Sequence, residues 1–167
     1  MRARTCIILS LLVFLTVLAS GCSRAAEEAS PTYSVYFLSR QVDRVRALVP
    51  EERTLPPDMD PVEGLLTLLL EGPSDEDLTS PIPDGVTLRS WTLADGLLTV
   101  DFSARYASLS GVSLTLADYS VAETLCQLEE VEAVEITAEG DYLPYRDHQR
   151  LTAEDTLSLE EDSAEEN

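Results

Sequence analysis

Apolar residues at helical spacing mark two segments of the chain as amphipathic helices. The first lies after Asp60, which suits an N-cap, begins at Pro61, and ends at Gly72-Pro73. Its apolar stripe consists of Val62, Leu65, Leu66, Leu69 and Leu70. A second helix is predicted over residues 113–130, where one face carries Leu114, Ala117, Val121, Leu125 and Leu128.

β-Branched and aromatic residues predict strands around these helices. Residues 32–38 form one such run, and residues 131–138 alternate between apolar and polar positions. Asp95-Gly96 is typical of a two-residue type I′ turn, which would join strands over residues 86–94 and 97–102. A short strand near residues 47–49 and a helical turn within residues 104–110 are also expected.

The order of these elements is β-α-β-β-α-β. It predicts an α+β fold, an open-faced sandwich in which two helices cover one face of a mostly antiparallel sheet. We expect this folded domain to span residues 32–145. The acid-rich residues 146–167 are expected to form a disordered tail.

The start of the chain has the features of a secretory signal. Arg2 and Arg4 precede an uncharged apolar run over residues 6–21, which is shorter than the roughly 20 residues that a transmembrane helix needs. The run ends in Ala19-Ser20-Gly21-Cys22, which is similar to the bacterial lipobox, although Ala19 stands where leucine is usual. The alternatives are an ordinary signal peptide cut near Ala19 or an uncleaved anchor.

The lipobox resemblance implies that residues 1–21 are removed and that Cys22 carries a diacylglycerol. Two acyl chains suffice for stable attachment, so the chain is expected at the extracytoplasmic face of a membrane. Residues 22–31 would then be a flexible tether. Of the other two cysteines, Cys6 would leave with the signal and Cys126 would have no disulfide partner.

Charge narrows the range of partners. The chain has 31 acidic and 11 basic residues, a formal net charge of −20. Removal of residues 1–21 takes away Arg2 and Arg4 and no acid, which brings the charge to about −22. Nucleic acid is therefore excluded as an expected partner, and anionic lipids and wall polymers should be repelled unless cations bridge the charges.

Several segments together resemble the GerM (GerMN) domain of sporulation and germination lipoproteins. The similar segments are residues 61–73, residues 82–86, residues 96–103 with the core Thr99-Val100-Asp101-Phe102-Ser103, and residues 119–128 followed by 131–136. The resemblance implies a fold like the ring-building motifs of secretion and sporulation machines. It also implies an assembly and interaction module without catalytic residues. Cys126 departs from the family's pattern and is expected to be neutral packing.

Few residues are candidates for chemistry. His148 is the only histidine and is expected at the surface, and Cys126 is expected to be a core thiol rather than a nucleophile. Asp101 could be a functional carboxylate, but we expect it to bond the backbone of the Ser103-Ala104 turn. The acidic run over residues 129–139 could bind calcium weakly, yet it lacks EF-hand spacing and is better explained as a solvated face. No enzyme, cofactor or metal site is expected.

Trp91 and Tyr106 are candidate anchors for a partner, because aromatic side chains dominate interface energetics. The alternative for Trp91 is that it packs under a helix. The leading functional hypothesis is a non-enzymatic envelope lipoprotein that binds envelope or sporulation proteins, or its own kind. The alternative is a ligand-binding lipoprotein that captures a cell-wall fragment or a cation.

Overall fold

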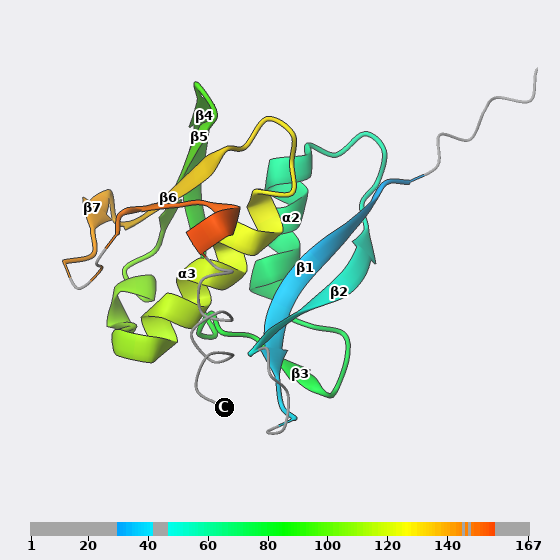
Figure 1. Ribbon diagram of the computed structural model, residues 1–167, viewed down its shortest axis with the longest axis horizontal. Coiled ribbons are helices and arrows are strands. Elements are labelled where there is room, and N and C mark those ends of the chain that lie inside the picture. Colours follow the sequence, from blue (N-terminus) through cyan, green and yellow to red (C-terminus); the bar gives the residue numbers. More distant parts are fainter. Residues whose placement is uncertain (1–29, 42–46, 145, 147, 156–167) are drawn as a thin grey trace, which may run out of the picture.

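The computed structural model describes residues 30–41, 47–144, 146 and 148–155, and has the predicted α+β character (Figure 1). Its two main helices are α2 (Pro61–Glu71) and α3 (Gly111–Leu125). The strands form two sheets rather than the single sheet that was expected, and α3 contacts both of them. The helices therefore lie between the sheets, and the core fills the space around them.

The first sheet has the order β2-β1-β3, and both of its ladders are antiparallel. β1 (Thr32–Ser39) lies in the centre, between β2 (Leu48–Thr54) and the two-residue β3 (Leu78–Thr79). The prediction for residues 47–49 was too short, because Pro50 and the charged residues after it hide a strand that nevertheless pairs along the whole of β1.

The second sheet has the order β4-β5-β6-β7, and β8 also pairs with β6. Its strands are β4 (Leu88–Ala94), β5 (Leu97–Phe102), β6 (Ala133–Ala138), β7 (Asp141–Tyr142) and β8 (Arg150–Leu151). Asp95 and Gly96 have φ values of 50° and 77°, so the type I′ hairpin prediction is confirmed. β5 and β6 are parallel because α3 connects them, while the remaining ladders of this sheet are antiparallel.

Helix α2 follows its sequence signals closely. An Oδ1 atom of Asp60 accepts a hydrogen bond from the Glu63 backbone N–H at 3.0 Å, and Gly72 ends the helix with a φ of 84°. α3 is shorter than the predicted 113–130, because the chain turns after Leu125 and reaches β6 through Leu128 and Val131.

The free side of β1 is covered by polar side chains of α3 and of the turn after it. Ser120 Oγ donates to the carbonyl oxygen of Tyr36 at 2.6 Å, and Thr124 Oγ1 accepts from the Tyr36 N–H at 3.1 Å. Gln127 accepts from the Ser34 N–H at 3.0 Å and donates to the Ser34 carbonyl oxygen at 2.7 Å. These side chains occupy the position of a missing strand, which explains why Ser120 and Thr124 are fully buried.

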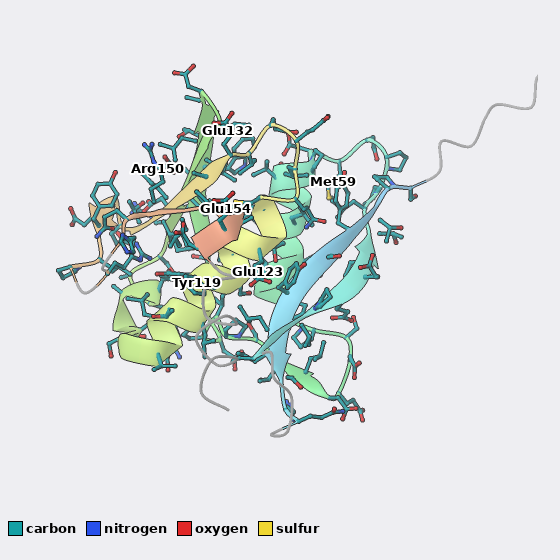
Figure 2. All side chains as sticks on the ribbon, viewed as in Figure 1. Met59, Tyr119, Glu123, Glu132, Arg150 and Glu154 are labelled. Atoms are coloured by element: carbon teal, nitrogen blue, oxygen red, sulfur yellow. The ribbon has the colours of Figure 1, made fainter. Side chains whose placement is uncertain are left out.

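The C-terminal segment corrects the predicted domain boundary. β8 pairs with β6 through Val134–Leu151 and Glu135–Arg150, and it also contacts α3. Figure 2 shows Glu154 of this segment over the part of α3 that carries Glu123. The prediction of a disordered tail from residue 146 is therefore wrong for residues 146 and 148–155, and residues 156–167 lie outside the described residues.

Candidate functional site

The three residues that the sequence singled out as sites have different positions. Trp91 lies on β4, is partly buried, and packs against the core. Tyr106 lies in the 3-10 turn η1 (Tyr106–Ser108) and is completely buried, with its ring stacked on Phe102 at a centroid distance of 4.8 Å. The prediction of Tyr106 as a surface anchor is therefore wrong. Cys22 lies outside the described residues.

Tyr106 instead belongs to a buried polar cluster. Its hydroxyl donates to Oδ1 of Asp118 on α3 at 2.8 Å. Arg146 contacts both oxygens of the same carboxylate, with Nε 2.6 Å from Oδ2 and Nη2 2.7 Å from Oδ1. Nη1 of Arg146 also donates to the carbonyl oxygen of Ile136 in β6. The cluster thus joins η1, α3, β6 and the C-terminal segment.

The charges of this cluster are balanced internally. The side chains of Arg146 and Asp118 are only 3% and 4% exposed. Burial raises the pKa of the Asp118 carboxyl, and the hydrogen bonds and charge of Arg146 act against that shift. Burial, together with the negative charge of Asp118, raises the pKa of Tyr106 well above its ordinary value. The three groups satisfy one another, so the cluster is suited to stabilising the fold rather than to transferring protons.

Sequence reasoning missed Asp118 and Arg146, although Asp118 carried a signal. It follows Ala117 directly and lies four residues after Leu114 and three before Val121, within the apolar face of the helix. A carboxylate at such a position needs a partner when it is buried. The sequence does not indicate which arginine pairs with Asp118, because the two residues are 28 positions apart in the chain.

A cavity of about 120 Å³ adjoins the ion pair. Its other walls are Leu114, Thr115, Tyr119, His148 and Leu151. Small-molecule pockets commonly measure roughly 300–1,000 Å³, so this cavity has room for only a few waters. His148 is exposed at its rim, in agreement with its expected position at the surface.

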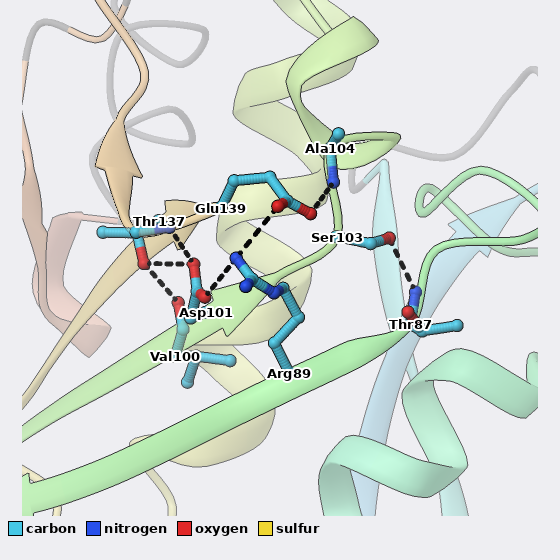
Figure 3. Close-up of polar contacts among 9 residues, drawn as sticks. Thr87, Arg89, Val100, Asp101, Ser103, Ala104, Thr137 and Glu139 are labelled. Atoms are coloured by element: carbon cyan, nitrogen blue, oxygen red, sulfur yellow. Dashed lines mark hydrogen bonds and ion pairs between the residues drawn. The ribbon is translucent and has the colours of Figure 1, made fainter.

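A second polar network surrounds Asp101 (Figure 3). Its Oδ1 accepts from the Thr137 hydroxyl at 2.8 Å and from the Gly140 N–H at 2.7 Å, and its Oδ2 lies 3.2 Å from Arg89. The Ala104 N–H donates to Glu139 instead, at 3.1 Å. Asp101 therefore does bond backbone, but that of the turn after β6 rather than the predicted Ser103-Ala104 turn, because the parallel β5–β6 ladder brings that turn beside it.

Cys126 has a thiol suited to packing. It is partly buried at the end of α3, and burial raises its pKa to about 11. The thiol is therefore protonated at neutral pH and is a weak nucleophile. Within the part of the chain that the structure describes, no group of three or more His, Cys, Asp or Glu side chains is placed to hold a metal ion.

A wider groove lies between the end of α2 and the loop that follows β3. Its volume is about 560 Å³, within the usual range for ligand pockets. Its acidic side chains are Glu71, Asp75, Glu76 and Asp84, against one basic side chain, Arg40. A groove with this charge would attract cations or basic groups.

No helix in the part of the chain that the structure describes is long and apolar enough to cross a membrane.

Residues 34–143 match the family model Germane, which is described as sporulation and spore germination. Lipoprotein LpqB of Cutibacterium acnes is 35% identical over 117 residues, which is 67% of this chain and 19% of that relative. The chain thus spans about a fifth of the length of LpqB.

Two solved structures show the same fold. The tandem GerMN domains of the sporulation protein GerM from Bacillus subtilis match with a TM-score of 0.64 at 18% identity, over 76% of this chain and 48% of that one. The first GerMN domain alone matches with a TM-score of 0.63 at 18% identity, over 75% of this chain and 99% of that one.

Proposed function

Because the chain belongs to the Germane family, we propose that it is a lipid-anchored envelope lipoprotein whose domain is a non-enzymatic interaction module in sporulation, germination or cell-wall remodelling. The observation that carries the proposal is the family match over residues 34–143, which coincides with most of the folded domain and agrees with the resemblance found in the sequence.

The reactive side chains are engaged in contacts within the fold, and this supports a non-enzymatic role. Asp118 and Arg146 neutralise each other in the interior, and Asp101 is held by hydrogen bonds and an arginine. Cys126 keeps its proton at neutral pH because burial raises its pKa to about 11. These groups maintain the fold, and catalysis requires instead a group that is positioned against a substrate.

Lipid attachment is proposed from the leader and from the relative that is named a lipoprotein. The test is metabolic labelling with a palmitate analogue. Cys22→Ala should lose the label and leave the membrane or stall in processing, whereas Cys126→Ala, which removes a cysteine of the domain, should keep both label and membrane. Full-sized maturation and unchanged membrane retention of Cys22→Ala would contradict the anchor.

The interaction role is tested by photocrosslinking of the full-length protein in its own membranes. A photoreactive amino acid is placed at exposed positions on different faces, such as Met59, Thr92, Val112 and Tyr142. Discrete adducts at one face and none at another are expected of a binding module. Absence of any adduct at every position would contradict it.

The acidic groove favours one alternative, a lipoprotein that captures a cation or a cell-wall fragment with basic groups. Thermal-shift measurements with calcium and with a muropeptide separate the two roles, since a ligand that binds only the folded state raises the melting temperature. A rise that is lost in Glu76→Gln, but kept in Glu132→Gln outside the groove, would support capture.

A further inference from the structure

The strand edges of this protein are protected by different devices. The free side of β1 is occupied by Ser120, Thr124 and Gln127, as described above. The outer side of β6 is covered by β7 and β8, and Arg146 binds the Ile136 carbonyl oxygen in the gap between them. Such covering is how folded proteins prevent a strand edge from pairing with another chain.

β2 is an edge strand with a sequence that discourages pairing. Pro50 removes a backbone donor, and Glu51, Glu52 and Arg53 follow it. Proline and charged side chains are common means of blunting an edge. β3, β7 and β8 have two residues each and are too short to act as templates.

β4 lacks these protections over Ser90–Ala94, beyond the irregularity between Leu88 and Ser90. It has seven residues, contains no proline and no acid, and pairs only with β5 among the strands that the structure describes. Its one charged residue, Arg89, lies 3.2 Å from both Asp101 and Glu139, so that charge is already compensated. Figure 1 shows the β4–β5 hairpin at the margin of the molecule, away from the first sheet.

The hairpin geometry fixes which backbone groups of β4 face outward. In a two-residue hairpin the residues that flank the turn, here Ala94 and Leu97, exchange hydrogen bonds, and such pairs then alternate along the ladder. Thr92 therefore bonds to β5, whereas the N–H and C=O groups of Trp91 and Leu93 point to the open edge. The side chains of Trp91 and Leu93 are only partly buried against the core.

We propose that the open edge of β4 pairs with β4 of a second copy of the chain, antiparallel and centred on Thr92, which extends the five-stranded sheet across a twofold axis. In this register Trp91 of each copy exchanges two hydrogen bonds with Leu93 of the other, so all four outward groups of each strand are satisfied. The register uses only Ser90–Ala94, the part of β4 that follows the irregularity between Leu88 and Ser90.

A second copy is the occupant that the chemistry of β4 favours. The strand is self-complementary in this register, because Trp91 and Leu93 lie on one face and each meets the other type across the axis. A chain with a net charge of −20 repels its own copies, yet β4 brings no carboxylate of its own to the contact. The proposed lipid anchor would also favour pairing, since tethering two copies to one membrane raises their effective concentration. The inference thus deepens the proposed interaction role and rests on it.

Trp91 reports directly on this contact because it is the only tryptophan in the chain. In the full-length protein in detergent micelles, rising concentration should double the protein mass in sedimentation and shift the Trp91 emission to the blue. Added salt should strengthen the association, because it screens the repulsion between two acidic chains. An unchanged mass and emission spectrum over the whole concentration range would overturn the proposal.

Cysteine scanning tests the register in a Cys126→Ser background. Thr92 lies opposite itself across the axis, whereas Ser90 lies opposite Ala94, and all three side chains are exposed. With copper phenanthroline as the oxidant, Thr92→Cys should form disulfide-linked dimers faster than Ser90→Cys or Ala94→Cys. Equal rates at the three positions would refute the register and the proposal with it.

Failure of self-pairing can be told apart from failure of the proposed function. If β4 served a strand of a different protein, the purified chain would stay monomeric and Trp91 would not respond to its concentration, which overturns the inference. Photocrosslinking at Thr92 in native membranes would still give an adduct in that case. Loss of adducts at every exposed position would instead count against the interaction role itself.

Discussion

Replacing Arg146 with methionine should be among the most damaging single substitutions outside the hydrophobic core. Methionine keeps much of the length and apolar volume of the side chain but removes the guanidinium. Asp118 would lose both of its contacts to Arg146, at 2.6 and 2.7 Å, and keep only the Tyr106 hydroxyl. The Ile136 carbonyl oxygen would lose its donor at the same time.

The size of the effect follows from the burial of the pair. Both side chains are at most 4% exposed, and the cavity beside them has room for only a few waters, so water can replace the lost contacts only in part. Breaking a buried ion pair by removing one partner costs about 3–5 kcal/mol, because a charge is left uncompensated. For a domain of this size, we expect the melting temperature to fall by about 12–20 °C, at about 4 °C per kcal/mol.

Arg150 supplies a matched control on the same segment. It pairs with Glu135 at 3.6 Å, but its side chain is 61% exposed. Arg150→Met should therefore cost at most about 1 kcal/mol. Urea unfolding followed by the emission of Trp91 measures both variants. The double variant Arg146→Met/Asp118→Asn should recover much of the loss, since the amide oxygen still accepts from Tyr106 without carrying a charge.

Two outcomes would refute this reasoning. If Arg146→Met were no less stable than Arg150→Met, the ion pair would contribute nothing beyond a surface contact. If the double variant were as unstable as Arg146→Met alone, the cost would come from lost packing or from the Ile136 carbonyl oxygen rather than from the unpaired charge.

Two further predictions follow from local geometry. Gly96→Ala and Gly140→Ala should each destabilise the fold by about 1–2 kcal/mol in thermal melts, because alanine disfavours the positive φ of both positions. At Gly96 the new Cβ would also come within 2.8 Å of the Glu132 side chain, but that side chain is exposed and can rotate away, so the two losses should be similar. A loss at Gly96 several times that at Gly140 would contradict this. Burial raises the pKa of Tyr106 well above its ordinary value. Above about pH 10 the unfolded chain therefore releases a proton from this tyrosine that the folded chain keeps. The free energy of unfolding should fall as the pH rises through this range. Tyr106→Phe should show a shallower fall in urea midpoints across that range, and an identical slope would refute the assignment.

The elements that the sequence predicts well are those whose signals are local. The cap at Asp60, the stop at Gly72 and the turn at Asp95-Gly96 each depend on a few neighbouring residues, and the structure has helix α2 and the β4–β5 hairpin where these signals place them. Membership of the family was also accessible, because two of its motifs, at residues 61–73 and 99–103, lie in these same segments.

What the sequence could not provide depends on contacts between distant residues. The segment after residue 145 is acidic and short of apolar residues, so nothing local indicates that Arg146 and Leu151 return to α3 and β6. Tyr106 was misplaced because its burial requires both the stacking on Phe102 and a carboxylate from another element. The division into two sheets was missed because pairing partners are not encoded in strand periodicity.

The polar side chains of α3 and of the turn after it, which cover β1, have a consequence for the aggregation of this protein. Ser120, Thr124 and Gln127 occupy the hydrogen-bonding groups of β1 only while the helix is docked. When α3 detaches in a local opening, the amide and carbonyl groups of Ser34 and Tyr36 become available to a strand of another chain. Aggregation of this protein should therefore begin from a state in which the native strands persist and helix α3 has detached from β1. Its rate should depend on the population of that opened state rather than on global unfolding.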